Sequence, residues 1–168
     1  MMDAIYLTGF MGAGKTTVGK ALGEKLGISV IDTDAVIVNK ENRPIDTIFR
    51  EEGEDSFRRK ETAVLYELPT KDVIVTTGGG IVLKKENRDY MKKHGIVFFL
   101  YCSPEKTYAR LENDTSRPLL KGDKRKEIAS RLVERMDRYL EADYVIDTSD
   151  LTIEETVAQI SAHLDKMK

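Results

Sequence analysis

The clearest chemical pattern in the chain is a glycine-rich stretch near its beginning. Residues 9–16 read GFMGAGKT, which fits G-x-x-x-x-G-K-[ST] and stands between an apolar run and a segment with helical spacing. Such a loop can wrap its backbone N–H groups around an anion at a helix N-terminus. Lys15 should reach the β- and γ-phosphates of a nucleotide, and the Thr16 hydroxyl should ligate Mg²⁺, which prefers oxygen. The nucleotide-binding residues predicted here are Gly12, Ala13, Gly14, Lys15, Thr16 and Thr17. The alternative is a glycine-rich turn with a surface lysine.

Two carboxylates follow the second apolar run, at Asp32 and Asp34. Open α/β sheets bind their ligands at the carboxyl edge of the strands. If the chain stays extended here, both side chains face one crevice, one toward a metal and the other toward an acceptor hydroxyl as a base or an orienting group. The alternative role is an N-cap for the helix after Asp34.

A charged segment, GEDSFRRKE, spans residues 53–61 at the start of a helix. Arg58 and Glu61 are spaced i, i+3, so they share a helix face, and the glutamate can hold a guanidinium aimed at a substrate carboxylate. We expect Arg59 and Lys60 to belong to a solvated face.

A fourth ligand-binding segment is predicted where an apolar run leads into Thr77, Gly78, Gly79 and Gly80. Three consecutive glycines raise the entropy cost of folding, so a bare turn is a costly use of them. They allow a ligand to lie against the backbone and offer it N–H donors.

These segments are positioned by a regular alternation of strands and helices. Short β-rich runs occur at 4–7, 29–32, 73–76, 96–102 and 144–147, and helices are predicted at 15–26, 44–52, 56–68, from Pro104, at 125–141 and at 153–166. Five strands with helical crossovers indicate an α/β fold in which a mainly parallel sheet lies between two helical layers. The polar, aperiodic segment between Leu111 and Lys124 is expected to be a mobile loop.

Length, charge and composition restrict the function further. The chain has 168 residues, enough for about one domain. With 27 basic and 29 acidic residues its net charge is −2, which argues against coating nucleic acid or an anionic membrane. The single cysteine, Cys102, and the absence of a signal-like start favour the cytoplasm. We expect a monomer that binds neither nucleic acid nor membrane.

The ordered set of motifs resembles the shikimate kinase family of P-loop proteins. The matching segments are GFMGAGKT at 9–16, the IDTD pair at 31–34, GEDSFRRKE at 53–61, TGGG at 77–80, Arg110, and RPLL at 117–120. They occur in the family's order over almost the whole chain. The resemblance implies a single P-loop kinase domain with a five-stranded parallel sheet in the order 2-3-1-4-5. It also implies a helical substrate-binding insertion at about 33–62 and a lid at about 112–124.

The activity implied by this resemblance is ATP-dependent phosphorylation of the 3-hydroxyl of shikimate, with Mg²⁺, in aromatic amino acid biosynthesis. By matching position, Lys15 and Thr16 would serve the phosphates and Mg²⁺, with Asp32 holding the metal through water. Asp34, Arg58, Gly79 and Gly80 would bind shikimate, Asp34 at its hydroxyls and Arg58 at its carboxylate. Arg117 would close over the phosphates as a lid arginine, and Arg110 would stack on adenine. Lys15, Asp34 and Arg117 are therefore the predicted catalytic residues.

The last substrate motif departs from the family pattern. Family members usually show Arg-x-Pro-Leu-Tyr, whereas residues 135–139 read RMDRY. Matching on the arginine four positions before tyrosine selects Arg135 as the second carboxylate-binding residue. Arg131 and Arg138 lie within about a turn of it and remain alternatives.

Other functions remain open from the sequence. Gluconate kinase and other small-metabolite kinases share the loop and the fold but lack the combination of FRxxE, GGG and RPLL. A GTPase switch needs Asn-Lys-x-Asp, and the only Asn-Lys, at Asn39, is followed by Glu-Asn. A non-catalytic nucleotide-dependent regulator has no need of an acceptor pocket with two arginines and an aspartate.

Overall fold

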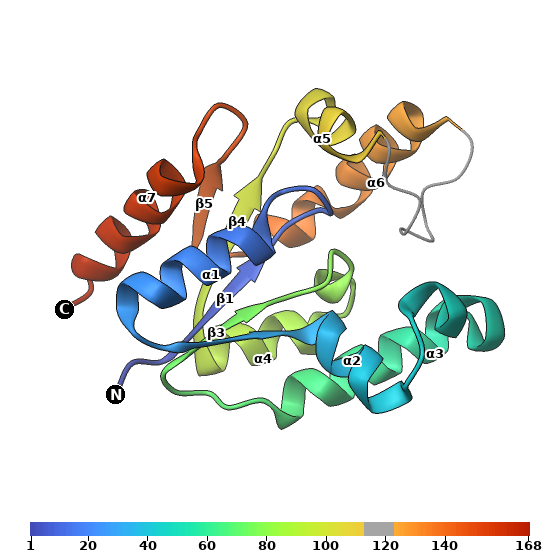
Figure 1. Cartoon of the computed structure of the whole chain (residues 1–168), viewed down its shortest axis with the longest axis horizontal. Coiled ribbons are helices and arrows are strands. Elements are labelled where there is room, and N and C mark those ends of the chain that lie inside the picture. The colour runs from blue at the N-terminus through green and yellow to red at the C-terminus, as the bar shows by residue number, and fades with distance from the viewer. Residues whose placement is uncertain (113–122) are drawn as a thin grey trace.

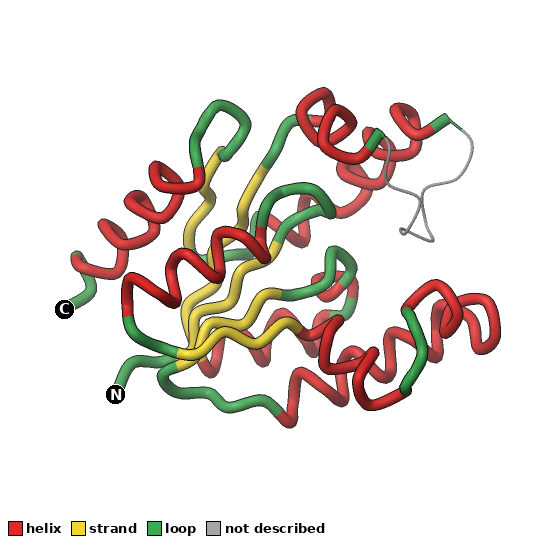
Figure 2. Tube along the Cα trace, in the orientation of Figure 1, coloured by secondary structure: helices red, strands yellow, loops and turns green. Residues whose placement is uncertain are grey.

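The computed structural model describes residues 1–112 and 123–168 and has a five-stranded sheet at its centre (Figures 1 and 2). The strands are β1 (Ala4–Thr8), β2 (Ser29–Asp32), β3 (Val73–Thr76), β4 (Gly95–Tyr101) and β5 (Tyr144–Asp147). They are parallel throughout, in the order β2-β3-β1-β4-β5. The predicted α/β fold and strand order are confirmed.

Helices cover both faces of the sheet because every strand alternates its apolar side chains between them. The helices are α1 (Lys15–Leu26), α2 (Thr33–Glu41), α3 (Ile45–Glu67), α4 (Lys85–His94), α5 (Pro104–Leu111), α6 (Lys124–Tyr139) and α7 (Ile153–Asp165), with a 3₁₀ turn at Ile81–Leu83. On one face Leu7 and Phe98 pack with α1 and α7. On the other, Tyr6 and Phe99 pack with α4 and α6. The result is the three-layer arrangement expected from the sequence.

Helices α2 and α3 pack together and lie at the lower right of Figure 1. They share a small core of Ile37, Ile48, Phe57 and Val64. Gly53 interrupts α3 with a φ of 84° and a ψ of 170°, so the two helices predicted at 44–52 and 56–68 are the two halves of one kinked element. Glycine tolerates this conformation, so the chain can bend at this one residue.

The chain does not stay extended through Asp34, so that part of the sequence prediction is wrong. Helix α2 begins at Thr33 and is capped by Asp32, whose Oδ1 accepts a hydrogen bond from the Ala35 N–H at 3.0 Å. Asp34 lies in the first turn of α2.

Helix α4 is absent from the set of helices predicted from the sequence. Across residues 1–112 and 123–168 no helix combines the length and apolarity that a membrane crossing requires.

Candidate active site

The loop after β1 has the shape expected of a phosphate-binding loop. Gly12 and Gly14 have φ values of 81° and 89°, a region that residues with a side chain rarely adopt, and Gly14 is the N-cap of α1. The Lys15 ammonium donates to the carbonyl oxygens of Gly9 and Phe10, the latter at 3.1 Å, so it lies across the loop. The loop therefore combines a helix N-terminus, backbone N–H groups and a cation.

This loop forms one wall of a cavity of about 340 Å³ at the carboxyl edge of the sheet. The other walls come from the ends of β2 and β3, so three strands contribute to one crevice. The lining residues are Met11, Gly12, Gly14, Lys15, Thr16, Thr17, Asp32, Asp34, Thr77, Gly78 and Gly79. The cavity thus contains both aspartates and two of the three glycines predicted to bind ligands.

An oxygen cluster suited to Mg²⁺ lies beside the loop. The Thr16 hydroxyl donates to Asp32 Oδ2 at 3.3 Å, and the Thr76 hydroxyl donates to the same oxygen at 3.0 Å. A hydroxyl and a carboxylate next to a phosphate-binding loop are the ligand types that Mg²⁺ takes in phosphoryl-transfer sites. The residues present therefore fit the cation predicted from the sequence, with Thr76 holding Asp32 in place.

Asp34 faces the glycine segment from the first turn of α2. A Cβ atom placed on Gly78 would lie 2.7 Å from Asp34 Oδ1 and 2.9 Å from Glu61 Oε2. Only a residue without a side chain fits between these carboxylates. The glycine at this position therefore brings the backbone of the 77–80 segment against both acidic groups.

Arg58 is buried and held by two carboxylates, of which its spacing predicted one, that of Glu61. Its Nη1 donates to Glu61 Oε1 at 3.1 Å, and its Nη2 donates to Glu54 Oε2 at 3.2 Å. The guanidinium also lies 5.3 Å from the ring centre of Phe57. A Cβ atom on Gly80 would overlap the guanidinium, so Arg58 lies directly against the glycine segment. The predicted pairing of Arg58 with Glu61 is confirmed.

Glu61 is the most deeply buried acid of this cluster, with none of its surface exposed. Burial raises the pKa of its carboxyl from 4.5 to about 7, and the charge of Asp34 acts in the same direction, while Arg58 and Arg135 oppose the shift. Glu61 therefore connects the two arginines and the aspartate electrostatically.

This raised pKa predicts a specific pH dependence of stability. The pKa in the folded protein, about 7, lies above the ordinary value of 4.5, so Glu61 contributes stability that is present below pH 4.5 and is lost as the pH rises through 7. We expect the free energy of unfolding of the wild type, relative to that of Glu61→Gln, to fall across this interval. Urea unfolding of both proteins at about pH 5, 6, 7 and 8 measures the difference.

The matched control for this experiment is Glu54→Gln, because Glu54 also pairs with Arg58 but is partly exposed. Its stability difference from the wild type should change much less with pH, since an exposed carboxylate stays solvated. A difference between wild type and Glu61→Gln that is constant from about pH 5 to 8 contradicts the raised pKa.

Of the three candidate arginines on α6, Arg135 is the one directed at the glycine segment. It is 2% exposed, and its Nη1 lies 3.5 Å from a Cβ position on Gly79. Its Nη2 is buried without a hydrogen-bond partner in the described part of the chain. Arg131 instead pairs with Glu127, and Arg138 donates to the Glu134 carbonyl. The geometry therefore selects Arg135.

We expect the two neighbouring arginines of α6 to differ strongly when replaced. Arg135→Ala should raise the KM for an anionic acceptor about 30-fold or more, because a buried guanidinium facing the acceptor is lost. Arg138→Ala should change it by less than about twofold, since the Arg138 guanidinium donates to the Glu134 carbonyl of its own helix and is not buried as Arg135 is. Steady-state kinetics with saturating ATP measures both values. The reverse ranking would mean that Arg138, about one turn further along α6, binds the carboxylate of the acceptor.

A second cavity of about 340 Å³ adjoins the other side of the phosphate-binding loop. It is lined by Gly12, Ala13, Gly14, Thr17, Val18, Arg110, Thr148, Leu151, Thr152, Ile153 and Thr156. The Arg110 guanidinium donates to the Gly12 carbonyl at 2.8 Å, which places this arginine beside the loop. The segment 148–153 was missed from the sequence. Its one available signal was the capping box formed by Thr152 and Glu155.

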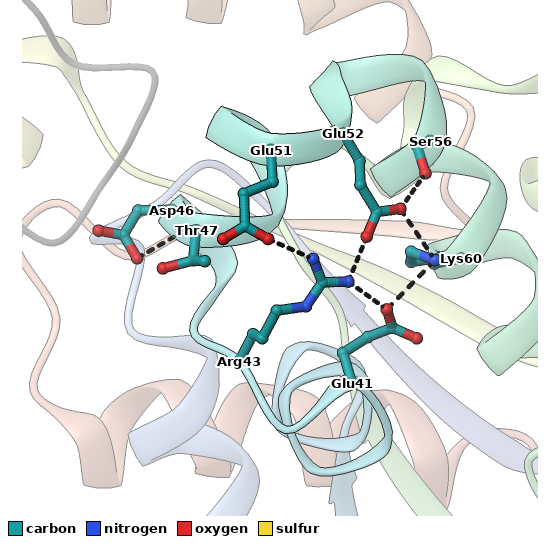
Figure 3. Close-up of polar contacts among 8 residues, drawn as sticks. All are labelled: Glu41, Arg43, Asp46, Thr47, Glu51, Glu52, Ser56 and Lys60. Carbon is teal, nitrogen blue, oxygen red and sulfur yellow. Dashed lines mark hydrogen bonds and ion pairs between the residues drawn. The ribbon is translucent and has the colours of Figure 1, made fainter.

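An ion-pair network joins α2 and the following Arg43 to α3 (Figure 3). Arg43 pairs with Glu41 at 2.7 Å, with Glu51 at 2.9 Å and with Glu52, and Lys60 pairs with Glu41 and Glu52 at 3.2 Å. Lys60 stays partly exposed, as expected for a solvated face, but its ammonium also joins both halves of α3 to the end of α2. The sequence did not show this network, since its members are separated by a helix kink.

One predicted residue cannot be placed. Arg117 and the central part of the predicted lid lie outside the described residues, so its proposed contact with phosphates stays a prediction from the sequence.

Comparison with known proteins points to one family. A sequence model described as shikimate kinase matches residues 11–165. A shikimate kinase of Bacillus cytotoxicus is 51% identical over 159 residues, 95% of this chain and 96% of that protein. Among solved structures, a shikimate kinase from Acinetobacter baumannii in complex with shikimate has a TM-score of 0.95 and 37% identity, covering 100% of this chain and 96% of that one. A shikimate kinase from Bacteroides thetaiotaomicron has a TM-score of 0.90 and 34% identity, covering 98% and 99%.

These similarities extend over nearly the full chain. They agree with the phosphate-binding loop, the oxygen cluster for Mg²⁺ and the acceptor side with two buried arginines. The chain belongs to the shikimate kinase family and is a phosphotransferase that uses ATP and Mg²⁺.

Proposed function

We propose that the site transfers the γ-phosphoryl group of ATP to the 3-hydroxyl of shikimate, giving shikimate 3-phosphate and ADP. One observation carries this proposal. Two buried guanidinium groups, Arg58 and Arg135, lie against the glycine segment that borders the phosphate-binding cavity. This arrangement suits a small acceptor with a carboxylate, and the similar Acinetobacter baumannii enzyme was solved in complex with shikimate.

The nucleotide side is proposed to extend across both cavities. Gly12, Ala13 and Gly14 offer backbone N–H groups to the phosphates, and Lys15 supplies a positive charge for the transferred group. Thr16 and Asp32 hold Mg²⁺, which neutralises charge on the phosphate oxygens when it is bound. Thr17 lies between the two cavities, and Arg110 borders the second one, where adenine would lie.

The acceptor side is proposed to orient shikimate by its two ends. Arg58 and Arg135 bind the carboxylate, while the N–H groups of Gly79 and Gly80 contact oxygen atoms of the acceptor. Asp34 receives a hydrogen bond from the reacting hydroxyl, which holds it toward the phosphate-binding loop and accepts or orients its proton. Arg117 completes the set as the predicted lid arginine.

The experiment that tests this function measures ADP release with a panel of acceptors. The panel contains shikimate, gluconate, nucleoside monophosphates and no acceptor, each with ATP and Mg²⁺. We expect rapid ADP release only in the reaction that contains shikimate as the acceptor. Preference for gluconate would identify another small-metabolite kinase, and ADP release independent of acceptor, or none, would favour a nucleotide-dependent regulator.

We also propose that the protein works as a monomer in the cytoplasm. The residues proposed for the nucleotide, Mg²⁺ and the acceptor all belong to one chain, and those described lie together around the glycine segment. Cys102 is a buried free thiol, which suits a reducing compartment. Light scattering of the purified protein tests the first statement and cell fractionation tests the second.

A further inference from the structure

The glycine segment and the 3₁₀ turn that follows it are held in shape by side chains from three separate helices. The Gly78 N–H donates to the Thr33 hydroxyl of α2 at 3.2 Å, and Asn87 of α4 donates to the Ile81 carbonyl at 3.0 Å. The third contact comes from α6, where the Tyr139 hydroxyl donates to the Gly79 carbonyl at 2.5 Å. Of these contacts, only the one from Tyr139 reaches the Gly79–Gly80 peptide.

Tyr139 is fixed tightly enough to orient this peptide. Its side chain is 1% exposed, and its ring stacks on Phe99 with a centroid distance of 4.7 Å and an interplanar angle of 9°. Burial raises the pKa of its hydroxyl to about 12, so the group stays protonated and remains a donor near neutral pH. The ring position is thus set by packing, and the hydroxyl by its bond to the carbonyl.

The Gly79 carbonyl and the Gly80 N–H belong to the same peptide unit. This peptide is trans, so the two groups point in roughly opposite directions. Fixing the carbonyl toward Tyr139 therefore fixes the N–H on the other side. No acceptor for the Gly80 N–H is found within residues 1–112 and 123–168.

The acceptor groups lie around the same peptide. Gly80 lies directly against the Arg58 guanidinium, while Gly79 lies near Arg135. Arg135 and Tyr139 are four residues apart on α6, so they occupy the same helix face. One helix face therefore carries both a carboxylate-binding group and the group that holds the glycine peptide.

We propose that Tyr139 is a positioning residue for the acceptor, acting through the Gly79–Gly80 peptide to aim the Gly80 N–H at an oxygen atom of shikimate. The inference rests on the proposed function. Without the hydroxyl, the peptide can rotate, and the N–H loses its fixed direction although the ring still packs on Phe99. Shikimate binding should then weaken while ATP binding is unchanged.

Tyr139→Phe tests the inference, because it removes only the hydroxyl. We expect the KM and the calorimetric Kd for shikimate to rise about 5- to 10-fold, the effect of one lost hydrogen bond. The KM for ATP should stay within about twofold, because the phosphate-binding loop is not touched. Tyr6→Phe is the matched control, since Tyr6 is also 1% exposed and belongs to the same apolar cluster. It should leave both KM values unchanged.

Three outcomes would overturn the inference. Shikimate KM and Kd unchanged in Tyr139→Phe would show that the hydroxyl does not position the acceptor. Equal increases in both KM values together with a lowered thermal midpoint would indicate general loosening of the fold. A similar shikimate effect in Tyr6→Phe would assign it to the core. Failure of the proposed function is seen separately, as a wild-type protein that does not phosphorylate shikimate.

Discussion

We expect Lys15→Ala to lower kcat by a factor of about 10² to 10³ or more, with little loss of stability. The Lys15 ammonium lies across the phosphate-binding loop, where it donates to the carbonyls of Gly9 and Phe10. When the γ-phosphoryl group is transferred, charge develops on its oxygens, and this cation is positioned to stabilise that charge. Alanine at this position leaves the transition state without the fixed charge.

Stability should change little because Lys15 is the first residue of α1, directly after the phosphate-binding loop, and its side chain does not belong to an apolar core. Lys20→Ala is the control, since Lys20 is an exposed lysine of the same helix. Its kcat should stay within about twofold of the wild type. Steady-state ADP release and thermal unfolding measure both variants. If kcat of Lys15→Ala stays within threefold of the wild type, the assignment of the phosphate-binding loop fails.

The fold could be predicted because its strands are short apolar runs separated by helices with clear spacing. Strand β3, for example, is the run Val73–Thr76 in both the sequence and the structure. Helix α2 was anticipated only as the helix after Asp34 in the capping alternative and within the helical insertion at about 33–62 that the resemblance implied. Spacing did not predict it, since residues 35–38 form a continuous apolar run that has no helical period. Helix α4 was missed because Tyr90 and Met91 are its only apolar residues.

The site was predictable where it is contiguous in the sequence. The phosphate-binding loop, the aspartate pair and the glycine segment each carry their chemistry within a few residues. Contacts that the topology makes could not be predicted in this way. Tyr139 and Gly79 are 60 residues apart, and nothing in either segment indicates that they touch.

The roles of the charged residues in the kinked helix α3 were hard to predict for a different reason. Arg58 and Lys60 belong to one run of charged residues, but one faces the glycine segment and the other joins the network of Arg43. Helical spacing separates their faces, yet only the position of α2 shows that Lys60 has carboxylate partners. A solvated charge and a structural ion pair have the same sequence pattern.

The second large effect is expected at Arg58, where alanine should weaken shikimate binding about 30- to 5,000-fold. This range corresponds to roughly 2–5 kcal/mol, the usual cost of truncating one member of a buried charge pair. ATP binding should change by less than about threefold, because Arg58 does not line the cavity at the phosphate-binding loop. Calorimetric titration with each ligand measures both affinities.

Two further variants separate loss of recognition from loss of structure at this position. Arg59→Ala removes the adjacent exposed arginine and should leave both affinities unchanged. Arg58→Lys keeps the positive charge beside Glu61 but loses the planar guanidinium, so it should fold well and still bind shikimate poorly. Removing the guanidinium entirely leaves Glu61 buried without its ion-pair partner, which would further raise the pKa of its carboxyl. Equal losses of affinity for shikimate and ATP in Arg58→Lys would refute the assignment of Arg58 to the acceptor.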